Sequence, residues 1–160
     1  MRSTLTLLTC VALVATAGCA RSERVATVCP DSAIIHGLDR MYGEDAAGRE
    51  IIVTLENIDG VCTYSGTQLS LDMTVDLVVE AAPGTVIPYF VVTTSPAGEV
   101  LEKASFVATV PSQPGLTPLR IRERLVQEVN GVAAGTSAGY AVLFGLDLPP
   151  EIALEQRRAL

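Results

Sequence analysis

The clearest pattern in the chain is a regular alternation of apolar and polar residues from Leu69 to Glu80. Every second position carries a large apolar side chain, and the positions between them are polar except for Val78. Successive side chains of a β-strand point to opposite faces of its sheet, so a period of two residues indicates a strand with one buried face. The segment Ala81–Gly84, which contains a Pro-Gly pair, is typical of a turn and ends the predicted strand.

Shorter apolar segments between turn residues predict further strands. The segment from Val86 to Thr94 is apolar on both faces, as expected of a strand in the middle of a sandwich. Pro88 within it has no N–H group, so we expect it at an edge, a bulge or the start of a strand. Asp59-Gly60 predicts a tight turn between two strands. In chain order, the expected strands are Glu50 to Ile58, Val61 to Tyr64, Leu69 to Glu80, Val86 to Thr94, Glu99 to Val110, Leu119 to Val129 and Ser137 to Leu148.

The sequence pattern between Leu119 and Val129 is compatible with either a helix or a strand. Ile121, Leu125 and Val129 recur every four residues, which suits one side of a helix. The turn dipeptide Asn130-Gly131 and the regular succession of strands before it favour a strand, and we assign one.

These segments together predict an all-β protein. Seven or so strands with frequent turns indicate an antiparallel β-sandwich of immunoglobulin-like or fibronectin-like architecture. The likeness is one of architecture only, because the chain has no Trp for the buried position that antibody domains fill with it. The segment Glu151 to Arg158 follows a Pro-Pro pair and ends in arginines, so we expect a short C-terminal helix there.

The first twenty residues are typical of a secretory signal. Arg2 is the only charged residue before Arg21. The apolar run from Leu5 to Ala17 is too short for a membrane span, which needs about 20 apolar residues. We therefore expect export across a membrane rather than insertion into it.

The end of this run resembles the lipobox of bacterial lipoproteins. Its residues are Thr16-Ala17-Gly18-Cys19, with Thr16 where that family prefers Leu. The resemblance implies cleavage before Cys19 and acyl chains on Cys19. The alternative is an ordinary signal peptide cut near Ala17 or Ala20. The expected organisation is a signal peptide at 1–18, a lipidated tether at 19–27 and one β-sandwich domain at 28–160.

Cysteine usage fits an exported protein. Cys10 would leave with the signal and Cys19 would carry lipid, so Cys29 and Cys62 remain in an oxidising compartment. We expect them to form a disulfide, which would stabilise the fold by roughly 3.7 kcal/mol through loop closure. The alternatives are a metal pair or a redox pair. Neither fits well, because the chain has no C-x-x-C motif and its single histidine, His36, cannot complete a four-ligand zinc site.

Composition narrows the classes of function. The chain has 160 residues, 49% of them hydrophobic, which excludes a disordered polymer and suits one domain. Its formal net charge is −7, and loss of the signal, whose only charge is Arg2, makes it −8. This acidic balance argues against nucleic-acid binding.

We find no set of residues suited to catalysis, metal binding or cofactor binding. Gly135–Gly139 matches the G-x-S-x-G pattern around Ser137, but it precedes a strand, and His36 lies far upstream. We therefore expect a plain loop at Ser137 and a histidine at the edge of a strand. Asp72, Asp76 and Glu80 share one face of a strand, too far apart to share a metal ion, and we expect that face to be solvated.

Arg120, Arg122 and Arg124 form the best candidate surface. They alternate along an expected strand and would lie about 6.6 Å apart on one face. Such a stripe could meet an acidic protein, lipid phosphates or lipopolysaccharide. It could equally pair with carboxylates of a neighbouring strand or protect a sheet edge.

The aromatic residues are few and are expected in the core, although a ligand cleft lined by them is the alternative. Of the seven aromatic residues, those expected in the core are Tyr89, Phe90, Phe106, Tyr140 and Phe144.

Several short motifs resemble a family of small, uncharacterised alphaproteobacterial lipoproteins. The similarity runs from about Cys29 to Arg157 and implies a lipid-anchored β-domain with a cysteine pair, without implying an activity. The motifs are Cys29-Pro30, Cys62-Thr63-Tyr64, Pro88-Tyr89-Phe90-Val91, Gly98-Glu99-Val100-Leu101-Glu102-Lys103 and Tyr140-Ala141-Val142-Leu143-Phe144-Gly145.

The expected function is that of a non-enzymatic lipoprotein of the bacterial cell envelope. Acyl chains on Cys19 would hold it to a membrane, the outer membrane facing the periplasm, where it would bind or scaffold an envelope protein. The alternative is a periplasmic binding module for a small apolar or anionic ligand.

Overall fold

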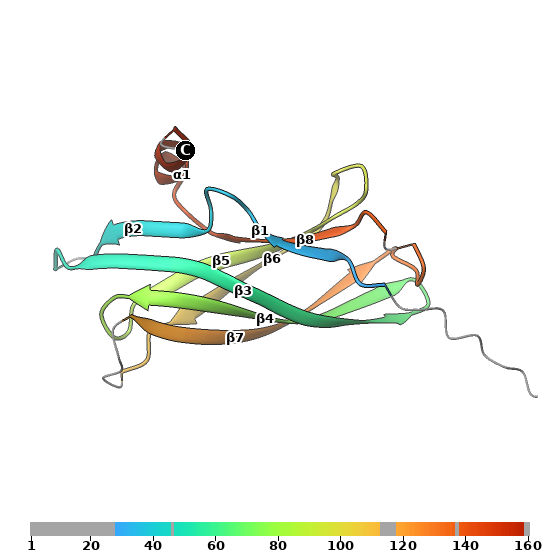
Figure 1. Ribbon diagram of the computed structural model, residues 1–160, viewed down its shortest axis with the longest axis horizontal. Coiled ribbons are helices and arrows are strands. Elements are labelled where there is room, and N and C mark those ends of the chain that lie inside the picture. Colours follow the sequence, from blue (N-terminus) through green and yellow to red (C-terminus); the bar gives the residue numbers. More distant parts are fainter. Residues whose placement is uncertain (1–27, 46, 113–117, 137, 159–160) are drawn as a thin grey trace, which may run out of the picture.

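Two β-sheets packed face to face make up the protein, and a short helix follows the last strand (Figure 1). The computed structural model describes residues 28–45, 47–112, 118–136 and 138–158. One sheet has the strand order β1-β8-β5-β6, and the other has the order β2-β3-β4-β7. The predicted β-sandwich with a C-terminal helix is confirmed. The elements are β1 (Asp31–Ile34), β2 (Arg40–Glu44), β3 (Glu50–Ser65), β4 (Gln68–Glu80), β5 (Val86–Thr94), β6 (Val100–Thr109), β7 (Leu119–Asn130), β8 (Ala141–Leu146) and α1 (Pro150–Arg158).

Some predictions concern residues outside this description. They are the signal peptide at 1–18, the lipidation site Cys19, the tether at 19–27 and Ser137 of the G-x-S-x-G pattern.

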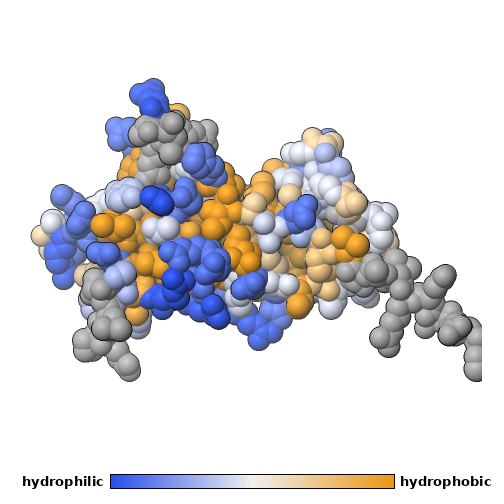
Figure 2. Space-filling view, viewed as in Figure 1, coloured by the Kyte–Doolittle hydropathy of each residue, from blue (hydrophilic) through white to orange (hydrophobic). Residues whose placement is uncertain are grey.

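The core lies between the two sheets and is supplied by alternate residues of the strands. β4 provides the pattern predicted for it, since its odd-numbered apolar residues from Leu69 to Val79 are all buried. Each such side chain contributes roughly 1.5–3 kcal/mol when it is removed from water. Apolar residues also remain visible at the surface between the hydrophilic ones (Figure 2). Besides β4, the buried cluster contains Val53, Leu55, Cys62, Ile87, Tyr89, Val91, Ala108, Val110, Leu125, Val129, Val132, Val142, Phe144 and Leu146.

The turn predicted at Asp59-Gly60 is wrong, because β3 runs without interruption from Glu50 to Ser65. The chain reverses later, beside Gly66, whose φ of 62° lies in the left-handed region that favours glycine. Gly60 is needed for close approach instead, since a Cβ there would overlap Sδ of Met73 on β4. The Asp59-Gly60 pair is typical of a turn, but here the glycine is present because β3 and β4 pack closely at this position.

The ambiguous segment β7 is a strand, as assigned. Ile121, Leu125 and Val129 all face the core, because a spacing of four residues is also a multiple of the strand period of two. The last strand, β8, covers only part of the expected Ser137 to Leu148. The short strands β1 and β2 were not predicted.

Pro88 lies near the start of β5, which agrees with its expected position. Pairing between β5 and β8 begins one residue later, at Tyr89 opposite Leu146. Before that point the carbonyl oxygen of Pro88 accepts a hydrogen bond of 3.0 Å from the Asp147 backbone N–H. The missing N–H of the proline therefore leaves no gap in the ladder between β5 and β8.

The predicted disulfide between Cys29 and Cys62 is present, with a Cα–Cα distance of 5.6 Å. Cys29 lies two residues before β1 of one sheet, and Cys62 lies in β3 of the other. The bond therefore ties the two layers together where the described chain begins. Next to it, the Tyr64 hydroxyl donates a hydrogen bond of 2.9 Å to the carbonyl oxygen of Val28.

Helix α1 follows β8 and lies at the end of the sandwich opposite to the start of β1 (Figure 1). Within the residues that the structure describes, no helix has both the length and the apolar character needed to cross a bilayer.

Candidate interaction surface

The three predicted arginines lie side by side on the outer face of β7, which is an edge strand of its sheet. Their position follows from the strand period, because the residues between them face the core. The exposed fractions of the side chains of Arg120, Arg122 and Arg124 are 50%, 64% and 71%. The stripe predicted from the sequence therefore exists.

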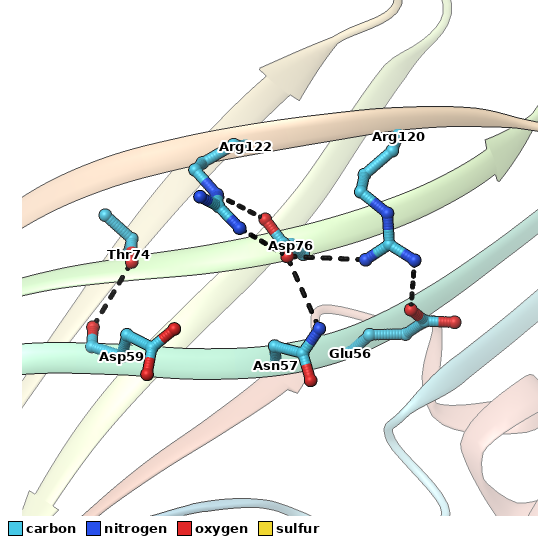
Figure 3. A network of polar contacts seen from close by, with 7 residues as sticks. All are labelled: Glu56, Asn57, Asp59, Thr74, Asp76, Arg120 and Arg122. Atoms are coloured by element: carbon cyan, nitrogen blue, oxygen red, sulfur yellow. Dashed lines mark hydrogen bonds and ion pairs between the residues drawn. The ribbon is translucent and has the colours of Figure 1, made fainter.

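Asp76 of β4 lies at the centre of a polar network beneath this stripe (Figure 3). Arg122 donates two hydrogen bonds to it, Nε to Oδ1 at 2.7 Å and Nη2 to Oδ2 at 2.9 Å. Arg120 Nη1 approaches Oδ2 at 3.3 Å. Asn57 Nδ2 donates to the same oxygen at 3.5 Å. A paired guanidinium–carboxylate arrangement of this kind is among the stronger polar interactions in proteins.

These contacts change both the exposure and the acidity of Asp76. Only 2% of the residue is accessible, although it lies on the outer face of its sheet. Hydrogen bonds from Arg122 are the largest cause that lowers the pKa of Asp76 to about 2, and Asn57 and the charge of Arg120 act in the same direction. The prediction that Asp76 belongs to a solvated face is therefore wrong.

The other two arginines also have carboxylate partners. Arg120 Nη2 lies 2.7 Å from Glu56 Oε2 of β3. Arg124 donates to both carboxylate oxygens of Asp72, at 2.8 Å and 2.5 Å, and these hydrogen bonds lower the pKa of Asp72. The pairing alternative considered for the stripe is the one found.

Strand register and one β-bulge bring the residues of the network together. Arg122 is paired directly with Asp76 across β4 and β7. In β3 the register shifts between Leu55 and Ile58, and this bulge places Glu56 and Asn57 beside Asp76. Neither Glu56 nor Asn57 was expected at the site from the sequence. A bulge depends on the pairing of two strands, so no local pattern marked it.

The surface is not basic overall. The three arginines face four carboxylates, those of Glu56, Asp59, Asp72 and Asp76. Lipid phosphates or an acidic protein would have to displace bound carboxylates in order to reach the guanidinium groups. Attraction of an anionic partner by charge alone is therefore not supported.

Two exposed valines complete a mixed surface around Asp72. In the sheet register Val61 of β3 and Val126 of β7 are the partners of Asp72 on either side. Their exposed fractions are 63% and 57%. We call Val61, Asp72, Arg124 and Val126 the outer patch. Apolar area next to a held ion pair is a combination that protein–protein interfaces use.

The remaining sequence candidates are dispersed. His36 is exposed in the turn after β1, and Glu80 is exposed at the end of β4. Among the described residues no three or more His, Cys, Asp or Glu side chains come together in a way that could hold a metal ion.

Most of the aromatic residues contribute to the core. Tyr89 stacks on Phe106 with ring centroids 5.5 Å apart, and Phe144 is fully buried. Burial, helped by the charge of Glu123, raises the pKa of Tyr89 to about 12. Phe90 differs, because it lies on the outer side of β5, where Lys103 Nζ is 4.5 Å from its ring centroid.

No protein-family model matches the chain, and no curated protein matches it.

Proposed function

We propose that the protein is a lipid-anchored lipoprotein of the bacterial cell envelope and that its β-sandwich is a non-enzymatic interaction module. Acyl chains on Cys19 hold it to the outer membrane on the periplasmic side. The observation that carries this proposal is the disulfide between Cys29 and Cys62, since such bonds persist in oxidising compartments. The lipobox-like segment before Cys19 supplies the anchor.

The outer patch is where we place contact with a protein partner. Its two valines expose apolar area on a sheet whose edge strand carries ion pairs already in place. Side chains that are held in position lose little entropy when a partner binds.

Membrane fractionation of the producing cells tests the anchor. The wild-type protein is expected in the outer-membrane fraction and the Cys19→Ala variant in the soluble periplasmic fraction. Recovery of both proteins in the same fraction would contradict the proposal.

Cross-linking in intact cells, followed by recovery of the lipidated protein, tests the interaction. We expect one stoichiometric envelope protein. Its yield should fall with Val61→Ser/Val126→Ser and should be unchanged with Val107→Ser, a matched control because Val107 is 59% exposed on β6 of the other sheet. Equal losses in both variants would place the contact elsewhere.

The alternative is a periplasmic binding module for a small apolar or anionic ligand, and one observation favours a ligand between the sheets that also offers polar groups. The side-chain atoms Gln127 Nε2, Gln127 Oε1 and Thr93 Oγ1 are buried without hydrogen-bond partners among the described residues. Native mass spectrometry of the purified protein would reveal a bound small molecule, and a mass equal to that of the lipidated chain alone would exclude one.

A further inference from the structure

Three loops and the start of β1 meet at one end of the sandwich, on the right in Figure 1. The backbone N–H groups of Gly131 and Val132 donate to the Thr67 carbonyl oxygen at 2.8 Å and 3.0 Å. The Asp31 N–H donates to the Tyr140 carbonyl oxygen at 3.2 Å. We call this the tether end, made of residues 28–31, 65–67, 95–99 and the described part of 131–140.

The turn 95–99 joins the same end through close packing. A Cβ on Gly139 would lie 3.2 Å from Cβ of Pro96. The disulfide and the contact between Tyr64 and Val28 fix the start of the described chain there as well. The tether end is therefore a connected surface and not a set of separate loops.

Few charges occur at this end. Among its described residues only Asp31 and Glu99 are charged, although the chain has 18 acidic and 11 basic residues. The exposed positions of its loops are Gly, Ala, Ser, Thr and Pro apart from Glu99. In Figure 2 the right-hand end is mainly white, tan and orange, whereas most strongly hydrophilic residues lie over the middle and left.

Charged residues concentrate at the opposite end, which we call the far end. It contains the described residues of the turn between β2 and β3, the described ends of the connection between β6 and β7, and helix α1. Its charged residues include Glu44, Asp45, Arg49, Glu50, Glu80, Glu151, Glu155 and Arg158.

Chain length decides which end can approach a membrane. From Cys19 to Val28 the chain has nine residue steps, which span about 30 Å at most. β4 alone has 13 residues and is about 40 Å long. The segment from Cys19 to Val28 leaves from the tether end and is shorter than the sandwich. It therefore cannot run along the sandwich and place the far end at the membrane that holds the acyl chains.

The charge distribution favours the same orientation. The chain that remains after loss of the signal has a net charge of −8 and is repelled by anionic lipid, and this repulsion decays over about 8–10 Å at ordinary ionic strength. Carboxylates such as Asp59, Asp76 and Glu80 lie six or more residues along a strand from the tether end, which is about 20 Å or more. Small uncharged loops can therefore approach headgroups at little electrostatic cost.

We propose that the tether end rests on the lipid headgroups of the membrane that holds the acyl chains, so that the sandwich stands upright with the far end pointing away. The inference rests on the proposed anchor at Cys19. The tether end thus contacts a lipid surface. The outer patch stays accessible on the side of the upright domain.

Energy transfer between the full lipidated protein and labelled lipid tests the orientation. The protein is reconstituted into vesicles of phosphatidylethanolamine and phosphatidylglycerol that contain a trace of rhodamine-labelled lipid. A donor dye is attached through Thr67→Cys or Ala134→Cys at the tether end, and through Ala47→Cys or Ser112→Cys at the far end. We expect strong transfer from the first pair and several-fold weaker transfer from the second. Equal transfer from both ends would overturn the proposal.

Added charge gives a second readout. Thr67→Glu/Ala134→Glu should reduce transfer from a tether-end dye at Ala97→Cys, an exposed position, in anionic vesicles at low salt, and high salt should restore it. The matched far-end variant, Ala47→Glu/Ser112→Glu, should leave transfer unchanged. No effect of the tether-end glutamates would overturn the proposal.

The outcomes separate this inference from the proposed function. A wild-type protein missing from the membrane fraction would remove the anchor itself. A membrane-bound protein whose tether end cross-links in cells to another protein, and not to lipid, would overturn the orientation alone.

Discussion

Neutralising Asp76 should destabilise the fold at neutral pH and should have no such effect in strong acid. Asp76→Asn keeps the size of the side chain and removes the charge that Arg122 and Arg120 contact. A pKa of about 2 instead of 3.8 corresponds to roughly 2.4 kcal/mol of stabilisation of the charged form. Both guanidinium groups are at least half exposed, so screening by water reduces the expected loss to about 1–2 kcal/mol.

The pH dependence has a definite sign. The pKa of Asp76 is lower in the folded than in the unfolded protein, so its contribution is complete above about pH 4–5 and is lost as the pH falls through 3.8 towards 2. Urea denaturation of a Cys19→Ala parent and of the same protein with Asp76→Asn, at intervals from pH 7 to pH 2, gives the difference in unfolding free energy directly. That difference should shrink to near zero at the acid end.

The control is Asp59→Asn, an exposed carboxylate on the same face, which should change stability by less than about 0.5 kcal/mol at every pH. A difference between parent and Asp76→Asn that stays constant from pH 7 to pH 2 would refute the role assigned to the Asp76 charge.

Three further predictions concern stability, measured by thermal and urea denaturation. Cys29→Ser and Cys62→Ser should each cost about 2–5 kcal/mol with no further loss in the double variant, whereas additive losses would mean that the two are not bonded to each other. Gln127→Leu should stabilise the fold by about 1–2 kcal/mol, because it removes two buried polar atoms without partners, and a loss of stability would show that those atoms are satisfied. Gly60→Ala should destabilise by about 1–3 kcal/mol through overlap with Met73, and an unchanged midpoint would contradict the close approach.

The sequence predicts those elements of the fold that have a regular pattern of apolar and polar residues of their own. The alternation from Leu69 to Val79 needs no knowledge of a partner strand, and it gave β4 and its buried face. Where spacing fits two structures, as with Ile121 and Leu125, only the surrounding pattern could decide. The strands β1 and β2 have four and five residues that are mostly exposed, so pairing with β8 and β3 defines them rather than any pattern of their own.

The candidate site shows the same limit more clearly. Arg120, Arg122 and Arg124 could be recognised as a stripe from their alternation. Their partners could not, because Arg122 and Asp76 are 46 positions apart and meet only through strand register. Asp76 occupies a position that the alternating pattern predicts to be exposed. It is buried because side chains from another strand cover it.

The disulfide also determines how the domain responds to mechanical load. Tension on the chain before Val28 would otherwise act first on β1, which holds to β8 through only four residues. Because Cys29 precedes β1 and is bonded to Cys62, the load passes directly into β3, a 16-residue strand that pairs with β4 from Ile52 to Ser65. The four-residue edge strand β1 therefore lies outside the line of force for as long as the two sulfur atoms stay joined, and the long pairing of β3 with β4 carries the load instead.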